Sequence, residues 1–197
     1  MLRRPRSAAE YEETLRSCLD EVQRVQGLIE ELLELARIDA RQEPESAEPM
    51  AVNEIVEAAV AVVRPEAERR RVAISVEPAP ALLVNAAPGA AKVALANILD
   101  NAVKFSPAGS EVKIAVTGDR RQAIIAVSDT GPGIAAEDTA RLFERFYRGR
   151  ASRSAGVPGF GLGLAISRAL VERQGGRITV AAPQDSGVTF SVHLPRA

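Results

Sequence analysis

Residues 111–134 read EVKIAVTGDRRQAIIAVSDTGPGI, and this stretch decides the fold of the chain. Apolar and polar residues alternate over 111–117 and again over 122–128, as they do in β-strands that bury one face. The Gly-Asp pair between the two runs favours a tight turn, so together they predict an antiparallel hairpin. Asp129 follows directly and begins a glycine-rich turn, which places a carboxylate at the end of a strand.

The sequence on either side of this hairpin alternates between strand and helix patterns. Further helices are predicted at 53–71, capped by Asn53 and bent at Pro65, and at 89–104 and 161–174. Further strands are predicted at 72–76, 81–84, 177–181 and 188–194. Hairpins with helices between them predict an α+β fold, a two-layer sandwich with helices on one face of a mixed, mainly antiparallel sheet.

A long amphipathic helix is predicted to precede this sandwich. Residues 7–40 contain no proline, and their apolar residues recur with a heptad period. Ser7 and Glu10 form a capping box at its start. The helix could lie on its own domain or be half of a helical hairpin in a dimeric bundle, and the heptad spacing favours the bundle. Pro44 and Pro49 mark 41–49 as a connector.

Composition narrows the function classes. The 197 residues carry 25 Lys and Arg against 26 Asp and Glu, a balance that gives no electrostatic reason to expect a nucleic-acid or membrane-surface partner. A single cysteine, Cys18, excludes a disulfide framework and a cysteine-rich metal site. No stretch approaches the roughly 18 apolar residues of a membrane span, so we expect no membrane contact in this segment and a cytoplasmic setting.

Three polar residues share one face of the predicted helix 89–104. Asn97, Asn101 and Lys104 are spaced so that, at about 100° per residue, their side chains align. Amide oxygens are hard ligands that suit Mg²⁺, and a lysine ammonium is a good point charge for phosphate. The same spacing fits an ordinary polar helix face, and both interpretations stay open on these residues alone.

Three further stretches could bind or cover a ligand. Asp129 can accept a hydrogen bond from an exocyclic amino group such as that of adenine, and the glycines after it let the backbone approach a flat molecule, although a plain turn would look the same. Residues 159–164, GFGLGL, open a helix whose free N–H groups favour an anion, which is weak evidence by itself. Residues 148–158, basic and rich in Ser and Gly, suit a lid, and an idle surface loop would look similar.

Taken together, the order and spacing of these motifs resemble the ATP-binding catalytic domain of sensor histidine kinases, in the wider family that includes gyrase B, Hsp90 and MutL. Residues 97–106 (NILDNAVKFS) match the N box, 129–134 (DTGPGI) the G1 box, 142–148 (LFERFYR) the F box and 159–166 (GFGLGLAI) the G2 box. The resemblance covers roughly residues 50–197, and the long helix looks like the second helix of the family's dimerisation and phosphoacceptor hairpin.

The resemblance implies a role for each matched residue. Asn101 would coordinate Mg²⁺ beside Asn97, whose amide stands where ATPase relatives carry an acidic residue that activates water. Lys104 would contact phosphate, with Arg148 near the terminal one, and Asp129 would bind the adenine amino group. The other implied contacts are the loop under the base (Gly131, Gly133 and Ile134), the lid anchors (Phe143, Phe146 and Tyr147), the phosphate-facing turn (Gly159, Gly161, Leu162 and Gly163) and Thr189, which would support Asp129 through a hydrogen bond or water.

The family's phosphoacceptor histidine has no match here. The only histidine, His193, lies in a predicted strand, and we expect a solvated strand residue. We therefore interpret 1–45 as a partial dimerisation domain, with its second helix only, and 46–197 as the ATP-binding catalytic domain of a C-terminal fragment. The implied reaction moves the γ-phosphate of ATP to a histidine outside this chain and then to an aspartate of a response regulator, so this chain alone is not expected to phosphorylate itself.

Two other functions stay open. An anti-sigma-type kinase shares the ATP fold and phosphorylates a serine, but usually lacks the long heptad helix and the F box. A catalytically idle nucleotide-binding dimerisation module is opposed by the presence of Asn101, Lys104 and Asp129. The partners implied by the lead interpretation are the receiver domain of a response regulator and a second copy of the chain, bound through the N-terminal helix when the hairpin is complete. A parent protein could be anchored in a bacterial inner membrane.

Overall fold

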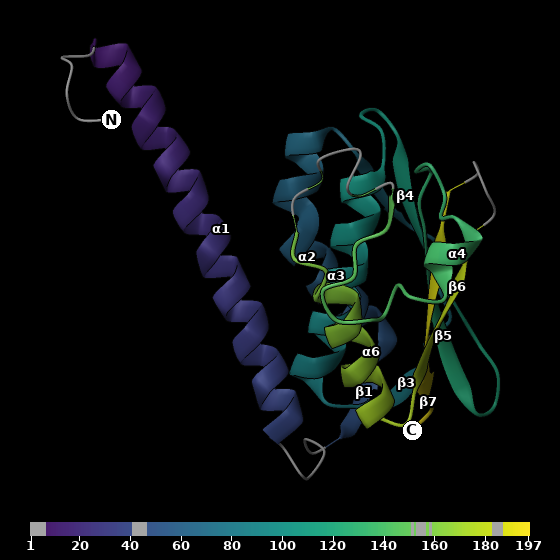
Figure 1. The fold of residues 1–197 in the computed structure, drawn as a ribbon. Coiled ribbons are helices and arrows are strands. Elements are labelled where there is room, and N and C mark those ends of the chain that lie inside the picture. The colour runs from purple at the N-terminus through teal and green to yellow at the C-terminus, as the bar shows by residue number, and fades with distance from the viewer. Residues whose placement is uncertain (1–6, 41–46, 151, 153–156, 158, 183–186) are drawn as a thin grey trace.

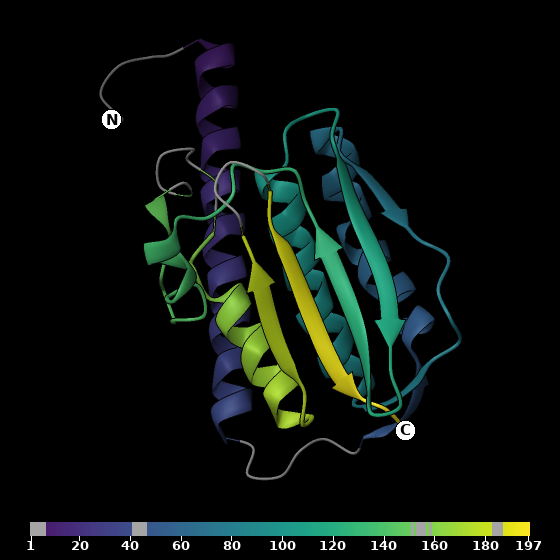
Figure 2. The ribbon, with the colours of Figure 1, turned by 90° about the vertical axis from the view of Figure 1, so that its right-hand side faces the viewer.

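Two layers, a sheet and the helices that cover one of its faces, make up the body of the molecule (Figure 1). The computed structural model describes residues 7–40, 47–150, 152, 157, 159–182 and 187–197. The helices of the covering layer are α2 (Val52–Arg70), α3 (Pro88–Phe105) and α6 (Gly163–Arg173), with α3 packed between the other two. Figure 2 shows the opposite, uncovered face of the sheet, with the helices behind it.

The main sheet has five strands in the order β2 (Ala73–Val76), β4 (Glu111–Gly118), β5 (Gln122–Ser128), β7 (Thr189–Pro195) and β6 (Arg177–Ala181). The pair β2 and β4 is parallel because α3 lies between them in the chain, and the other pairs are antiparallel. A second, two-stranded sheet pairs β1 (Glu48–Ala51) with β3 (Leu83–Ala86). The expected α+β sandwich with a mixed, mainly antiparallel sheet is confirmed.

The core lies between the sheet and the helices. In β4 and β5 every second residue is buried, which confirms the alternation that predicted the hairpin. Ile98 and Leu99 of α3 are fully buried against these strands, whereas Asn97, Asn101 and Lys104 are only half-buried. The core therefore fixes the rotation of α3 and leaves its polar face at the rim of the sandwich.

Helix α1 (Ala8–Ala40) begins at the expected capping box: Glu10 N–H donates to Ser7 Oγ over 3.3 Å, and Ser7 N–H donates to Glu10 Oε2 over 2.7 Å. Its C-terminal half lies against α6, and its N-terminal half projects beyond the rest of the molecule (Figures 1 and 2). Leu35 and Ile38 are buried, but most apolar residues of the heptad seam are exposed: Leu15, Leu19, Val22, Val25, Ile29, Leu32 and Leu33. None of the helices in the described ranges has the length and apolarity needed to cross a membrane.

Several expected boundaries are wrong, and pairing between distant segments explains them. Strand β1 begins at Glu48, inside the expected connector, because it pairs with β3, which itself runs to Ala86 rather than ending at 84. Asn53 does not cap α2; the cap is Ala51, and Val52 N–H donates to Leu82 O over 3.0 Å instead. Helix α2 runs on through Pro65.

Candidate functional site

Four segments that are far apart in the sequence meet at one end of the sandwich. They are the polar face of α3, the turn that follows β5, the segment from α4 (Ala136–Thr139) to residue 150, and the start of α6. Two neighbouring cavities lie between them and share Asn101, Phe105 and Leu142 among their walls. We name the first the Asp129 pocket, after its most buried carboxylate, and the second the Lys104 pocket, after its lysine.

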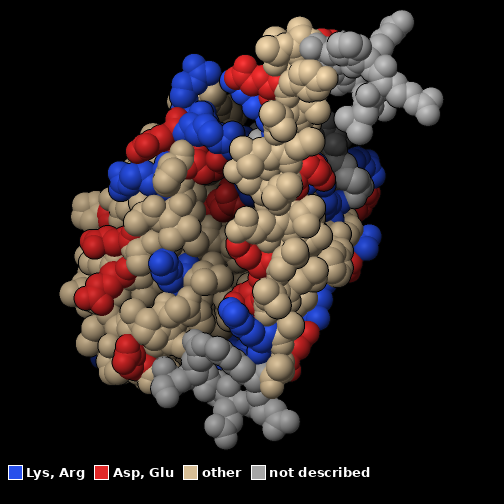
Figure 3. All heavy atoms as spheres, turned by 90° about the vertical axis from the view of Figure 1, so that its left-hand side faces the viewer, with Lys and Arg blue, Asp and Glu red and all other residues tan. Residues whose placement is uncertain are grey.

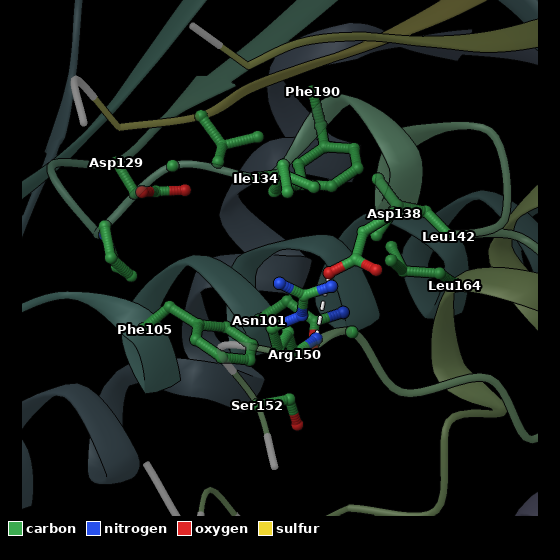
Figure 4. Close-up of a pocket in the computed structure, with 15 residues that line it drawn as sticks. Asn101, Phe105, Asp129, Ile134, Asp138, Leu142, Arg150, Ser152, Leu164 and Phe190 are labelled. Carbon is green, nitrogen blue, oxygen red and sulfur yellow. Dashed lines mark hydrogen bonds between the residues drawn. The ribbon is translucent and has the colours of Figure 1, made fainter. Parts of the chain in front are cut away.

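The Asp129 pocket has a volume of about 230 Å³ and mostly apolar walls. Figure 4 shows the Asp129 carboxylate, which follows β5, at one end of it and the side chains of Ile134, Leu142, Leu164 and Phe190 around it. The other lining residues are Asn101, Phe105, Pro132, Gly133, Ala135, Asp138, Gly149, Arg150, Ser152 and Val188. A flat apolar molecule with one polar edge fits such a cavity.

Asp129 is held rigidly and is only 8% exposed. Its Oδ1 accepts a hydrogen bond of 2.8 Å from Gly131 N–H, so the turn is closed by the aspartate that begins it. Burial raises the pKa of the Asp129 carboxyl, and hydrogen bonds from the backbone N–H groups of Gly131 and Val188 partly offset that rise. The carboxyl group retains acceptor capacity toward the cavity, which suits a ligand with an amino group.

The Lys104 pocket is more polar. Lys104 Nζ lies 2.6 Å from Asp100 Oδ2, and Asn101 forms part of the wall of both pockets. Asn97 Nδ2 donates to Gly163 O over 3.3 Å, which orients the amide and leaves Oδ1 as its acceptor end. The other lining residues are Glu31, Phe105, Leu142, Tyr147, Arg148, Gly149, Ser152, Gly159, Phe160, Gly161, Gly163 and Leu164. Cations, amides and glycine backbone together fit an anion such as a phosphate chain.

The segment after α4 is held beside both pockets by hydrogen bonds to one aspartate, Asp138. Asp138 accepts a hydrogen bond from Tyr147 Oη over 2.6 Å. It also accepts one from the backbone N–H of Arg150 over 2.8 Å (Figure 4). Arg148 donates to Ser152 Oγ over 3.1 Å and to Val157 O over 2.5 Å. Of the lid expected over 148–158, residues 151, 153–156 and 158 lie outside the described residues.

A glycine makes the junction between this segment and α6. Gly161 has a φ of +75°, and a Cβ there would lie 2.5 Å from Tyr147 O. Its carbonyl accepts a hydrogen bond of 2.9 Å from Phe146 N–H. Close approach of two backbones is thus the reason that this position requires glycine.

Most of the expected site residues line the two pockets. Three others lie behind the lining residues. Gly131 donates to Asp129, Leu162 is fully buried at the start of α6, and Phe143 packs edge-to-face on Phe190 with ring centroids 6.5 Å apart. These residues support the walls.

Phe146 and Thr189 do not line either pocket. The Phe146 side chain is 59% exposed and its backbone is left-handed (φ 63°), and its role as an anchor of the lid stays a prediction. Thr189 Oγ1 lies 2.9 Å from Ser128 Oγ, so its hydroxyl contacts the residue before Asp129, and support of Asp129 through water stays a prediction.

His193 is not part of the site. It lies on β7 toward the end of the sheet away from Asp129, with Nδ1 3.2 Å from Arg177 Nη2 and Nε2 3.1 Å from Thr179 Oγ1. Burial, with a smaller contribution from Arg177, lowers the pKa of its imidazole. The expectation of a strand histidine is confirmed, although its side chain is half-buried and hydrogen-bonded rather than fully solvated.

Sequence reasoning missed several wall residues. The apolar ones, Phe105, Leu142, Leu164, Val188 and Phe190, have the pattern of ordinary core positions. The first three lie within the N, F and G2 boxes, whereas no local signal separates Val188 and Phe190 from the core. Asp138 could have been suspected from its position shortly before the F-box aromatics. Glu31 could not, because it lies on α1, 66 residues before Asn97 in the sequence.

Comparison with known proteins agrees with this geometry. Residues 87–197 match the family model of the histidine kinase-, DNA gyrase B- and HSP90-like ATPases. The chain is 36% identical to the sensor protein IrlS of Burkholderia pseudomallei, over 98% of this chain and 41% of that protein. It is 34% identical to the phosphate regulon sensor protein PhoR of Pseudomonas aeruginosa, over 88% of this chain and 39% of that protein. The chain thus spans less than half the length of these relatives.

Solved structures show the same fold. The mycobacterial sensor histidine kinase MprB superimposes with a TM-score of 0.64 at 31% identity, over 76% of this chain and 97% of that one. Full-length ShkA gives a TM-score of 0.78 at 27% identity, over 98% of this chain and 40% of that one. The chain therefore belongs to the family of histidine kinase-, gyrase B- and HSP90-like ATPases, and within it to the ATP-binding catalytic domains of sensor histidine kinases.

Proposed function

We propose that this chain binds ATP together with Mg²⁺ and provides the catalytic region of a sensor histidine kinase, which transfers the γ-phosphate to a histidine and then to an aspartate of a response regulator. The observation that carries this proposal is the buried Asp129 carboxylate at the end of an apolar cavity that shares wall residues with the Lys104 pocket. An adenine amino group suits the carboxylate, and a phosphate chain suits the cations and amides beside it. The structure of ShkA, which supports the proposal, was solved in complex with AMPPNP.

The roles of the individual side chains follow from their chemistry. The amide oxygens of Asn101 and Asn97 are the hard ligands from which Mg²⁺ binding is expected, and the ion would neutralise phosphate charge when bound. Lys104 contributes a point charge to the phosphates, and Arg148 contributes a second cation from the lid side. The side chain at 97 is an amide, which does not act as a general base toward water, so transfer to a protein acceptor is favoured over hydrolysis.

The receiving histidine comes from outside these 197 residues, since His193 is paired with Arg177 and Thr179 far from both pockets. We assign residues 1–45 to a dimerisation and phosphoacceptor domain and 46–197 to the catalytic domain. The exposed apolar seam of α1 would bind the companion helix of the hairpin and a second copy of the chain. The receiver domain of a response regulator is the expected downstream partner, and the cytoplasm the expected compartment.

Calorimetric titration with a non-hydrolysable ATP analogue, with and without Mg²⁺, tests the nucleotide site. We expect Mg²⁺-dependent binding that weakens by a factor of ten or more, about 1.5–3 kcal/mol, in Asp129→Asn, because a charged acceptor is lost. Asp119→Asn is the matched control: it changes an exposed aspartate that caps a turn, and an asparagine can still accept the same backbone hydrogen bonds. Equal affinity in Asp129→Asn and the parent chain would contradict the assignment of the base site.

Transfer of labelled phosphate from ATP to a supplied histidine-bearing helix tests the reaction. Transfer to that histidine supports the kinase proposal, and transfer to a serine of a partner would favour the anti-sigma type of kinase. Nucleotide binding without any transfer would instead indicate an idle binding module.

A further inference from the structure

The C-terminal half of α1 is docked onto the catalytic domain by polar as well as apolar contacts. Leu35 and Ile38 are buried, and Arg173 of α6 donates to Ile38 O over 3.3 Å. Asp39 forms a two-pronged ion pair with Arg145, with N–O distances of 2.8 and 2.9 Å. Since Arg145 lies between Phe143 and Tyr147, α1 is joined to the segment that closes the pockets as well as to α6. Figure 3 shows this face, with acidic and basic side chains flanking α1.

One turn before Leu35, α1 places a carboxylate in the wall of the Lys104 pocket. Glu31 lines this cavity together with Asn97, Asp100, Asn101 and Lys104. Its Oε2 atom is buried and has no hydrogen-bond partner among the described residues. Burial raises the pKa of Glu31, the Lys104 charge opposes that rise and the Asp100 charge adds to it. An unpaired carboxylate oxygen in such a place is costly, because a buried charge requires a partner.

A phosphate chain would meet this carboxylate in the same pocket. The lysine, the amides and the glycine backbone of this pocket suit a polyanion, whereas Glu31 repels one. Asp100 is also acidic, but it pairs with Lys104 at 2.6 Å and belongs to the same helix as the polar face. Glu31 is the acidic side chain that enters the pocket wall from outside the catalytic domain.

We propose that Glu31 determines nucleotide selectivity by making the docking of α1 and the binding of the terminal phosphate mutually antagonistic. This inference rests on the nucleotide-binding function proposed above. With α1 docked, the pocket accepts a nucleoside with few phosphates more readily than one with three. Because coupling between two equilibria is reciprocal, a bound triphosphate loosens α1 by the same factor by which docked α1 weakens its binding. The nucleotide state would thereby control the freedom of the long helix.

Calorimetric titration with AMP, ADP and a non-hydrolysable ATP analogue, each with Mg²⁺, separates this inference from the alternatives. We expect Glu31→Gln to tighten binding of the ATP analogue about ten-fold and to leave AMP binding within about two-fold of the parent chain, in line with ordinary coupling strengths. Glu30→Gln is the matched control, since Glu30 is exposed on the same helix and accepts a hydrogen bond from Gln26 over 2.9 Å. It should change neither affinity.

Four outcomes would overturn the inference. Equal effects on AMP and on the ATP analogue would show that Glu31 does not distinguish phosphates. Weaker binding of the ATP analogue by Glu31→Gln would show that Glu31 is instead a ligand of the Mg²⁺ that accompanies it. If AMP and the analogue bind the parent chain and Glu31→Gln changes neither affinity, this inference falls and the proposed function stands. If no nucleotide binds any variant, both the inference and the proposed function fall.

A second variant tests the role of helix docking. Asp39→Asn removes the ion pair with Arg145 without touching the pocket, so it should tighten the ATP analogue by about two- to three-fold through weaker docking. The gain in the double variant should be smaller than the product of the two single gains, because both act on one equilibrium. Unchanged affinity in Asp39→Asn would overturn the antagonism. Circular dichroism melting of each variant verifies that the fold is retained.

Discussion

The Asp129 pocket and the Lys104 pocket share a wall but are built differently. The Asp129 pocket takes its shape from residues of the sandwich itself, such as Val188, Phe190 and Leu164, which also belong to the core or pack against it. The Lys104 pocket is completed by Glu31 of α1 and by Arg148, which contacts the other lid residues. The comparison indicates that the Lys104 pocket depends on how α1 is positioned, whereas the walls of the Asp129 pocket come from the sandwich and from the lid residues Arg150 and Ser152.

The largest effect should come from a substitution that displaces the backbone at Asp129. Gly187 has a φ of +81°, and a Cβ there would collide with the Asp129 carbonyl oxygen. We expect Gly187→Ala to lower the free energy of unfolding by about 2–3 kcal/mol, because strain and displacement of Asp129 add together, and to weaken adenosine binding. Urea denaturation measures the first and calorimetry the second. Gly89→Ala, with no atom within 4 Å of its Cβ, should be neutral or stabilising.

Removing the charge of Lys104 should show that the two pockets bind different parts of the nucleotide. We expect Lys104→Met to weaken ADP binding about ten-fold or more, through loss of a charged contact, while adenosine binding stays within about two-fold. Lys92→Met on the exposed face of α3 serves as the control. An equal loss for adenosine and ADP would mean that the lysine supports the structure of both pockets, which would contradict their independence.

Adenosine binding should depend on pH through a single group. In the proposed site, the ionised form of Asp129 would accept the amino group best, and burial raises the pKa of this carboxyl above the ordinary 3.8. Lowering the pH through this elevated pKa protonates the carboxyl and weakens binding, so the loss should begin at a higher pH than for an ordinary aspartate. Titration from neutral pH downward by calorimetry tests this. The curve for Asp129→Asn should be flat by comparison, and a parallel curve would assign the dependence to the ligand.

The smallest effect is expected at the hydrogen bond between Tyr147 and Asp138, which joins a residue of the Lys104 pocket to one of the Asp129 pocket. Tyr147→Phe removes the 2.6 Å hydrogen bond to Asp138, and we expect a loss of about 1 kcal/mol in unfolding free energy, with a similar weakening of adenosine and ADP binding. Thermal denaturation and paired titrations measure the two effects. Tyr11→Phe on the exposed part of α1 should change neither. An effect on ADP alone would show that this hydrogen bond supports the Lys104 pocket only.

The sequence by itself determined the local elements and the chemistry of the site. Alternation in 122–128, the spacing of Asn97, Asn101 and Lys104, and the Ser7–Glu10 capping box each follow from the period of a helix or strand and from contacts within a few residues, so they could be predicted. The order of the four boxes then identified the family, in agreement with the match over 87–197.

Tertiary structure alone decided which residues share a wall. The pairing of β1 with β3, the apolar lining from Leu164 and Phe190, and the docking of α1 depend on packing between distant segments, which leaves no local period in the sequence. Glu31 is the clearest case: on α1 it looks like one of many solvated glutamates, and only the fold buries its Oε2 beside Lys104. Burial changes the properties of a charge because it removes water, and that change cannot be deduced from the residue's neighbours in sequence.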